Sequence, residues 1–407
     1  MTIKLGVREL VEFTLRTGDL SATSGSQNTA QLGARIHRRL QKQRDSNYQK
    51  EYYLELPLTL NNQDYLLHGR ADGVTLSDTH ATIEEIKTSE TVFDQLKDNT
   101  LTLYWAQVKL YAHLLMQKFP ALEQVTLTLT YFQTNTETTT QTEQVLTKEA
   151  AKTFFDEVIA EYVTWLKFRA DLQERRDPTI RQLTFPFDHY RPGQRELAVA
   201  VYKTIVTSKR LFAEAPTGTG KTISTLFPTI KAIGEGLIQR IFYLTAKQST
   251  RRVAEEAITL MASQGLKLKS ITLTAKDKIK FPEEADLAPE DNPYMLGYYD
   301  RLKPALLDLL EHHDQLTRPV IEQVARKHTL DPFEFQLDAS LFCDVIIGDY
   351  NYLFDPQVHL QRFFATSDPD NFFLIDEAHN LVSRSRDMYS AAMSSHPLDH
   401  LIALSRD

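Results

Sequence analysis

One nine-residue segment constrains the fold of this chain more than any other feature. Residues 214–222 read E-A-P-T-G-T-G-K-T, which is the pattern of a phosphate-binding loop. Gly218 and Gly220 let backbone N–H groups turn inward around phosphate oxygens. Lys221 is spaced to reach the β- and γ-phosphates, and the Thr222 hydroxyl to ligate Mg²⁺. A loop of this kind requires an α/β framework with a parallel sheet.

The residues on both sides of the loop agree with that framework. Residues 211–213 are apolar and predict a short strand, and a helix is expected to open at Lys221, with its positive end toward the phosphates. Ala215 stands where the general template has glycine, so the match is imperfect. The alternative is a glycine-rich turn before an ordinary helix.

An acidic pair further along the chain fits the loop. Residues 373–379 read F-L-I-D-E-A-H, and the apolar run 372–375 is typical of a buried parallel strand. Asp376 at its end is expected to hold Mg²⁺ through water, and Glu377 to orient or deprotonate the attacking water. Together the two segments predict a site that binds a nucleoside triphosphate with Mg²⁺ and hydrolyses it.

These motifs resemble the superfamily 2 DNA helicases of the XPD/DinG type, over about residues 185–385. Residues 190–194 (Y-R-P-G-Q) resemble the adenine-side motif, and 243–245 (Y-L-T) resemble the strand end that touches single-stranded DNA through Thr245. The resemblance implies ATP, Mg²⁺ and DNA, mainly single-stranded, with 5′ to 3′ movement. The nucleotide-binding residues it implies are Gln194, Thr217, Gly218, Thr219, Gly220, Lys221, Thr222 and Asp376.

The chain departs from that family at the iron–sulfur position. Many members hold a cluster with four cysteines between the phosphate loop and D-E-A-H. The matching positions here are Lys280, Leu287, Asn292 and Asp331, and the chain has one cysteine, Cys343. One thiol cannot hold a cluster that needs four. We therefore expect no iron–sulfur cluster, a segment held by packing and hydrogen bonds, and a Cys343 that behaves as a small buried hydrophobe.

A second departure concerns length. The sequence stops at Asp407, soon after D-E-A-H, and the second motor lobe of the family is missing. We expect this sequence to be a fragment of a longer protein. The alternative is a natural protein that has only the first motor lobe. Residues 1–407 alone are expected to bind ATP·Mg²⁺ weakly, to hydrolyse it slowly and not to unwind duplex DNA, because translocation needs two lobes that close around nucleotide.

Another group of polar residues lies in the N-terminal half. Residues 69–73 read G-R-A-D-G and are expected to end one strand, and residues 83–87 read I-E-E-I-K and are expected to form the next strand. Glu85 and Lys87 are two apart and face the same way on a strand. Asp72 and Glu85 offer hard oxygen ligands for Mg²⁺ or Mn²⁺, and Lys87 can position the attacking water or stabilise charge on the phosphate. Glu84 is less favoured as the ligand because the spacing to Lys87 selects Glu85.

This arrangement resembles the PD-(D/E)xK nuclease fold, and two neighbours resemble its RecB-like branch over about residues 30–120. His37 matches the metal-binding histidine of the branch. Gln107 and Tyr111 share one helix face and match its Q-x-x-x-Y helix, which contacts the active site and DNA. Each of these residues also has a simpler structural interpretation when it is considered alone. Asp72 could lie in a hairpin turn and Glu85 on a solvated strand face. His37 could lie on a surface helix and Tyr111 in the core. The basic residues around His37 fit either a solvated helix face or a patch that tracks phosphates: Arg35, Arg38, Arg39, Lys42, Arg44 and Lys50.

Composition limits the remaining choices. The 407 residues are 42% hydrophobic with a net charge of −8, so nucleic acid must be bound by local patches. One cysteine, no signal peptide and no membrane-spanning run indicate a cytoplasmic location. An amphipathic helix is expected over 152–169, with Pro178 breaking the pattern. The predicted domains are a nuclease domain over 1–178, a linker over 179–187, a RecA-like motor over 188–385 with an insert at about 270–340, and a helical, arch-like start over 386–407.

The sequence therefore predicts an α/β chain in which a PD-(D/E)xK nuclease-like domain precedes a RecA-like P-loop motor with a parallel sheet and an inserted helical segment. The predicted activity is ATP-dependent processing of single-stranded or branched DNA in repair or recombination. The alternatives are a helicase whose nuclease-like domain only binds DNA, and a P-loop ATP switch without unwinding activity. The predicted catalytic residues are Asp72, Glu85, Lys87 and Glu377. The metal ligands are His37, Asp72, Glu85, Thr222 and Asp376, and the DNA contacts are Gln107, Tyr111 and Thr245.

Overall fold

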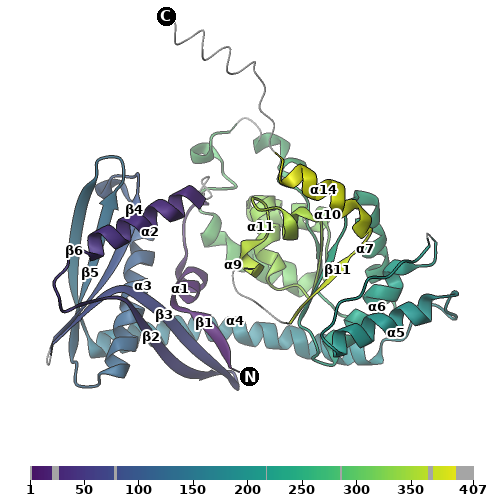
Figure 1. Cartoon of the computed structure of the whole chain (residues 1–407), viewed down its shortest axis with the longest axis horizontal. Helices are drawn as coiled ribbons and strands as arrows, with labels where there is room; N and C mark the ends of the chain where they lie inside the picture. Colours follow the sequence, from purple (N-terminus) through teal and green to yellow (C-terminus); the bar gives the residue numbers. More distant parts are fainter. Residues whose placement is uncertain are drawn as a thin grey trace, which may run out of the picture. The chain divides into compact units, whose positions relative to one another are not determined.

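The chain folds into two compact units. A computed structural model describes residues 2–20, 27–77, 80–216, 218–284, 287–364 and 370–390. The first unit comprises Met1–Leu172 and Asp286–Lys303, and the second comprises Gln173–Ala285 and Pro304–Asp407. The chain therefore passes between the units three times. Figure 1 labels many of the helices and strands of the two units.

The first unit is built on a mixed six-stranded sheet. The order is β1-β3-β4-β5-β6, with β2 paired to β3 as well. β1 runs parallel to β3 and β4 runs parallel to β5, whereas the other neighbours are antiparallel. The strands are β1 (Ile3–Gly6), β2 (Tyr48–Leu60), β3 (Gln63–Leu76), β4 (Ala81–Ser89), β5 (Gln124–Gln133) and β6 (Thr138–Thr147).

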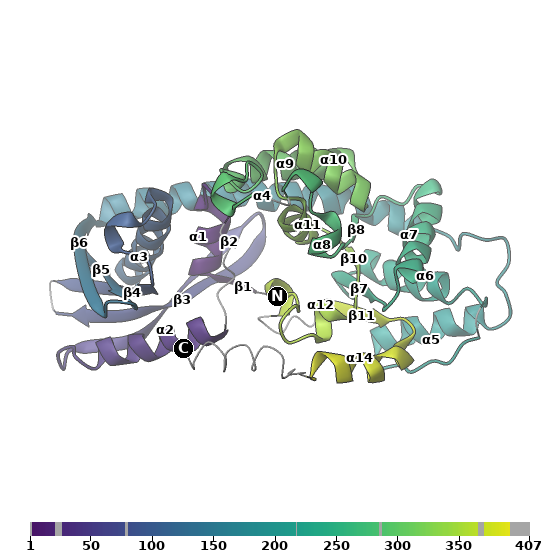
Figure 2. The ribbon, with the colours of Figure 1, turned by 90° about the horizontal axis from the view of Figure 1, so that it is seen from above.

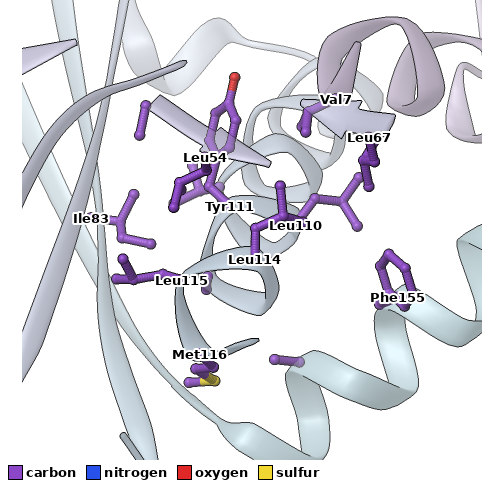
Figure 3. Close-up of a cluster of buried hydrophobic side chains, with 14 of the residues drawn as sticks. Val7, Leu54, Leu67, Ile83, Leu110, Tyr111, Leu114, Leu115, Met116 and Phe155 are labelled. Atoms are coloured by element: carbon purple, nitrogen blue, oxygen red, sulfur yellow. The ribbon is translucent and has the colours of Figure 1, made fainter. Parts of the chain in front are cut away.

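Helices cover both faces of this sheet. Figure 2 shows α2 and α3 on opposite faces. The helices are α1 (Val7–Leu15), α2 (Gln27–Gln41), α3 (Asp98–Lys118) and the long α4 (Lys148–Gln182), with a short 3-10 turn at Phe93–Gln95. Figure 3 shows the core beneath α3, where Leu110, Leu114 and Leu115 meet Leu54 and Ile83. This core holds α3 in place, and α3 carries two of the predicted site residues.

Helix α4 corrects the predicted linker. We expected Pro178 to end the helical pattern, but α4 continues to Gln182. A proline inside a helix removes one backbone hydrogen bond. Here Pro178 and Glu174, whose carbonyl loses its partner, are both exposed, so water can satisfy that carbonyl. Tertiary contacts then favour the helix, because Ile180 is fully buried and the buried Arg176 pairs with Asp344.

The second unit contains the parallel sheet that the phosphate-loop motif requires. All its neighbours are parallel, in the order β11-β7-β10-β8-β9. The strands are β7 (Arg240–Leu244), β8 (Ser270–Thr272), β9 (Gln315–Leu316), β10 (Val345–Gly348) and β11 (Asn371–Ile375). The helices beside them are α5 (Gln194–Val206), α6 (Lys221–Gly234), α7 (Gln248–Ser263), α12 (Asn351–Phe354), α13 (Gln361–Phe364) and α14 (Leu381–Met388). The predicted fold class, α/β with parallel strands, is confirmed.

Two details of this sheet differ from the sequence interpretation. Residues 211–213 form no strand, and the side chain of Phe212 is 93% exposed. A strand needs a ladder partner, and none of the described strands pairs with this segment. β11 was expected to be a buried strand, but it is the last in the strand order, and of its five residues only Leu374 is buried.

The insert between β8 and β10 is helical, as predicted. Its helices are α8 (Lys276–Ile279), α9 (Tyr298–His312), α10 (Arg318–His328) and α11 (Pro332–Ser340), with 3-10 turns at Pro282–Glu284 and Pro289–Asp291. Part of the insert, Asp286–Lys303, packs with the first unit, although the sequence assigned all of it to the motor. Cys343 is buried, as expected, and burial raises the pKa of its thiol.

The predicted arch-like start over 386–407 lies mostly outside the described residues. α14 ends at Met388, and residues 391–407 are not described. Among the described helices, none combines the length and apolarity that crossing a bilayer would require.

Candidate active sites

The first candidate site lies where one edge of β3 loses its partner. On this edge β3 pairs with β1 as far as His68 and with β4 from Gly73 onward. Asp72 falls in the gap between the two pairings. Its Oδ2 accepts a hydrogen bond from the backbone N–H of Ile86 at 2.7 Å, so its carboxylate links β3 to β4 where the strands diverge. Asp72 thus lies within a strand, which excludes the hairpin-turn interpretation.

Glu85 and Lys87 project from β4 on one face, as their spacing predicted. Lys87 Nζ donates to Glu85 Oε1 at 2.7 Å and to Gln107 Oε1 on α3 at 3.0 Å. Gln107 Nε2 in turn donates to the Tyr111 hydroxyl at 3.4 Å, so the predicted i, i+4 pair shares one helix face. Tyr111 is buried and lies over Gly69, where a Cβ atom would come within 2.7 Å of its ring. These contacts fix the ammonium group of Lys87 beside Glu85.

His37 reaches the same place from α2. Its Nδ1 lies 3.1 Å from Asp72 Oδ1. Burial opposes protonation of the ring, but the hydrogen bond and charge of Asp72, helped by Glu85, outweigh it and raise the pKa of His37. Burial raises the pKa of Glu85 to about 7, against the opposing effect of Lys87. His37, Asp72, Glu85 and Lys87 therefore influence one another electrostatically and form one cluster.

The donor set of this cluster suits a divalent cation. Glu85 Oε2 is buried and has no hydrogen-bond partner, although a buried carboxylate oxygen is normally satisfied. Carboxylates of Asp72 and Glu85 are hard ligands of the kind that Mg²⁺ and Mn²⁺ prefer. In the part of the chain that is described, no three His, Cys, Asp or Glu side chains are gathered into a ready metal cage. The fit therefore rests on the two carboxylates and the unsatisfied Glu85 oxygen.

Glu84 points to the opposite face of β4. Its carboxylate pairs with the Arg44 guanidinium and accepts a hydrogen bond from Thr130. This arrangement supports the choice of Glu85 over Glu84 as the site residue. Because Glu84 neutralises the charge of Arg44 inside the fold, Arg44 does not belong to the basic patch expected around His37. Arg39 lies over the Phe132 ring at 4.8 Å.

The second candidate site is the phosphate loop of the second unit. Gly218 and Gly220 have φ angles of +83° and +73°, which favour glycine. A Cβ atom at Gly220 would also come within 2.1 Å of Gln194 Nε2. Arg191 Nη1 donates to the carbonyl of Gly218 at 2.8 Å, a contact that sequence reasoning missed. Thr217 lies outside the described residues, and the Thr219 hydroxyl donates to the carbonyl of Pro216 at 2.8 Å.

Lys221 and Glu377 form an ion pair across this site. Lys221 Nζ lies 2.6 Å from Glu377 Oε1, and this contact lowers the pKa of Glu377. Glu377 has a φ of +54°, a left-handed conformation that is uncommon for a residue with a side chain. The Tyr350 hydroxyl donates to the carbonyls of Asp376 and Glu377 and supports this turn. The acidic pair is therefore held by its backbone at the end of β11.

Thr222 and Asp376 both contact the hydroxyl of Tyr243. The Tyr243 hydroxyl donates to Asp376 Oδ2 at 2.7 Å and lies 3.4 Å from Thr222 Oγ1. The predicted Mg²⁺ residues thus lie close together, as a nucleotide-bound cation requires. Sequence reasoning grouped Tyr243 with a DNA-contacting strand end and missed this contact. The sequence places Tyr243 near the end of an apolar run, but the pairing of that strand with the D-E-A-H strand is visible only in the fold.

Thr245 differs from the other predicted residues. Its side chain is only 1% exposed, and its Oγ1 lies 2.5 Å from Thr250 Oγ1. Its hydroxyl is therefore used inside the fold of the second unit in this structure. Gln194 is also buried, and its Oε1 accepts from the backbone N–H of Arg191 at 2.8 Å.

Comparison with known proteins matches two families on this chain. The model of the PD-(D/E)XK nuclease superfamily matches residues 9–194. The model of the DEAD_2 family matches residues 306–398. The helicase subunit XPD of general transcription and DNA repair factor IIH from Dictyostelium discoideum is 23% identical over 226 residues. That match covers 48% of this chain and 29% of that protein, so the chain spans less than a third of the length of this relative.

Two solved structures are similar to part of the chain. A structure of XPD helicase is 20% identical to this chain, with a TM-score of 0.33. The match covers 48% of this chain and 34% of the XPD helicase chain. A structure of truncated XPD is 21% identical to this chain, with a TM-score of 0.32. The match covers 46% of this chain and 52% of the truncated XPD chain. The family matches and the curated relative confirm the predicted resemblance to an XPD-like superfamily 2 helicase with a PD-(D/E)xK-like domain.

Proposed function

Because the chain combines an XPD-like helicase region with a PD-(D/E)xK-like region, we propose that it is an ATP-dependent DNA helicase-nuclease. Its substrate is single-stranded or branched DNA in repair or recombination, and its location is the cytoplasm. One observation carries the proposal: each unit has its own cluster of reactive side chains, centred on Glu85 and Lys87 in the first and on Lys221 and Glu377 in the second. The direction of movement, 5′ to 3′, follows from the family resemblance alone.

In the nuclease cluster, Asp72 and Glu85 would hold the divalent cation, and His37 would support it through its contact with Asp72. A bound Mg²⁺ or Mn²⁺ would polarise the phosphate and activate water. Lys87, fixed by Gln107, donates hydrogen bonds to the phosphate or to the attacking water. Tyr111 keeps Gln107 in position. The raised pKa of Glu85 is the ordinary consequence of a buried carboxyl group, and a cation beside it favours the ionised form.

In the motor cluster, the backbone of residues 218–220 surrounds the phosphates and Lys221 binds them. Thr222 and Asp376 would hold Mg²⁺, which neutralises charge on the phosphate oxygens. Arrival of a triphosphate draws Lys221 away from Glu377. Glu377 is then free to orient the attacking water. We propose that the protein works without an iron–sulfur cluster. Stoichiometric iron and sulfide in anaerobically purified protein would show this to be wrong.

A cleavage assay tests the nuclease part of the proposal. Purified chain should cut single-stranded DNA in Mg²⁺ or Mn²⁺ and not in EDTA. Asp72→Ala should abolish cutting, whereas Asp64→Ala, a change on the same strand at a residue bonded to Thr59, should not. If wild-type protein binds DNA in both metals but never cuts it, the first unit is a DNA-binding module, and the nuclease assignment is wrong.

A further inference from the structure

Tyr243 lies at the centre of the nucleotide site, although no motif assigns it a part in nucleotide binding. It is a buried residue of β7, 1% exposed, in the second unit. Its backbone is fixed on both sides, because it stands opposite Leu374 of β11 and Ile347 of β10. The ladder continues one residue beyond β11, where the N–H of Asp376 donates to the carbonyl of Leu244. The phenol and the Asp376 carboxylate are therefore held side by side by the sheet.

The hydrogen bonds at this phenol have a defined direction. A phenol has a single proton, and Tyr243 gives it to Asp376 Oδ2 at 2.7 Å. In the 3.4 Å contact with Thr222 Oγ1 the phenol oxygen must then accept. The Thr222 proton is turned toward Tyr243, which leaves the lone pairs of Thr222 free for a cation.

We propose that Tyr243 is the positioning residue for the Mg²⁺ that accompanies the nucleotide. Its hydroxyl orients the Asp376 carboxylate and the Thr222 hydroxyl together, so that both are prepared for the cation before nucleotide arrives. This role rests on the proposed nucleotide site and adds to it a residue that neither binds phosphate nor contacts the reacting water. The bond to Asp376 is made to a charged group, which is among the stronger hydrogen bonds in proteins.

The test separates binding of Mg²⁺ from binding of nucleotide. Affinity for a fluorescent ATP analogue is measured in EDTA and over a series of Mg²⁺ concentrations, without any readout of hydrolysis. Tyr243→Phe removes the hydroxyl and keeps the ring. It should raise the Mg²⁺ concentration needed for half of the Mg²⁺-dependent gain by about tenfold or more. Affinity in EDTA should stay as in the wild type.

A matched control is available in the same unit. Tyr352→Phe deletes another buried tyrosine hydroxyl, one that donates to the carbonyl of Thr274 at 3.4 Å and touches none of the nucleotide-site residues. It should leave both affinities unchanged. In an Asp376→Ala background, Tyr243→Phe should change the Mg²⁺ dependence much less than it does alone, because only the Thr222 hydroxyl is left for Tyr243 to orient.

Three results would overturn the role of Tyr243. The first is an unchanged Mg²⁺ dependence in Tyr243→Phe. The second is an equal loss of affinity with and without Mg²⁺, which would indicate a packing role. The third is a variant that no longer folds, because the hydroxyl would then be structural. If wild-type protein binds no nucleotide under any condition, the proposed motor site itself fails, and this outcome is distinct from the other three.

Discussion

At the scale of the residue, Lys221 and Glu377 form an ion pair in the candidate motor site. The cation that should bind phosphate is engaged with the carboxylate that should direct water, at 2.6 Å. Under the proposed function, the two groups would have to separate before Lys221 binds phosphate and Glu377 directs water. The left-handed φ of Glu377 indicates that its backbone is held by its surroundings, here by Tyr350, and not by its own preference.

Removing the charge of Glu377 tests this interpretation. Glu377→Gln should bind ATP·Mg²⁺ at least as tightly as the wild type, because Lys221 no longer has to leave an ion pair. Hydrolysis should fall by about a hundredfold or more, since a general base or water-orienting group is lost. Binding and single-turnover hydrolysis are measured together, with the exposed Glu290→Gln as control. A variant that hydrolyses ATP at the wild-type rate would remove Glu377 from the chemistry.

A second residue-scale prediction concerns pH and stability. His113 of α3 is 4% exposed and stacks on Phe155 at 4.1 Å, and burial lowers its pKa to about 4 from 6.5. Between these pH values the unfolded chain binds the proton more readily than the folded one. Stability should therefore be full above pH 6.5 and fall as pH drops toward 4, by at most about 3 kcal/mol.

Tryptophan fluorescence reports this effect selectively. The two tryptophans of the chain, Trp105 and Trp165, both lie in the first unit, so urea unfolding followed by their emission monitors that unit. His113→Phe should flatten the dependence of unfolding free energy on pH between 4.5 and 6.5, whereas the exposed His189→Gln should not. An identical slope in His113→Phe and wild type would show that His113 is not the group responsible.

At the scale of the element, the sequence predicted contacts inside one element better than contacts between elements. The pairs Glu85–Lys87 and Gln107–Tyr111 follow from strand and helix periodicity, and both are present. The contact between Tyr243 and Asp376 was missed because it depends on a register between strands far apart in sequence. Pro178 was misjudged for the same reason, since burial of the helix beyond it outweighs its local cost.

The segment at the iron–sulfur position shows another long-range effect. Asp19 Oδ1 accepts from the Gly297 backbone N–H at 2.7 Å, and the Gly18 carbonyl accepts from the Tyr299 N–H at 2.9 Å. Leu20 N–H donates to the Met295 carbonyl at 2.9 Å. Within the first unit, these hydrogen bonds attach residues 295–299 to residues 18–20.

Asp19 offers the clearest test of this attachment. Lys97 and then the Gly297 N–H lower the pKa of Asp19, so it is ionised at neutral pH and bound to both. Asp19→Ala should make residues 287–303 cleave several-fold faster in limited proteolysis mapped by mass spectrometry. The exposed Asp94→Ala should change nothing. Equal protection of 287–303 in Asp19→Ala would mean that other contacts hold the segment.

At the scale of the whole molecule, the two candidate sites lie in different compact units of one chain. The residues of the nuclease cluster come from α2, β3, β4 and α3, all in Met1–Leu172, and those of the motor cluster all come from the second unit. Each core is complete around its own sheet, as the buried clusters beneath α3 and beside β7 show. The chemistry of one site therefore does not require residues of the other.

Separate loss of the two activities tests this account most directly. Nucleotide binding and cleavage of single-stranded DNA are measured for Lys221→Ala and for the double variant Asp72→Ala, Glu85→Ala. We predict that Lys221→Ala loses ATP·Mg²⁺ binding and still cuts single-stranded DNA without ATP, whereas the double variant binds ATP·Mg²⁺ and cuts nothing. Cleavage that persists in the purified double variant, or disappears in Lys221→Ala, would contradict the assignment of two independent active sites.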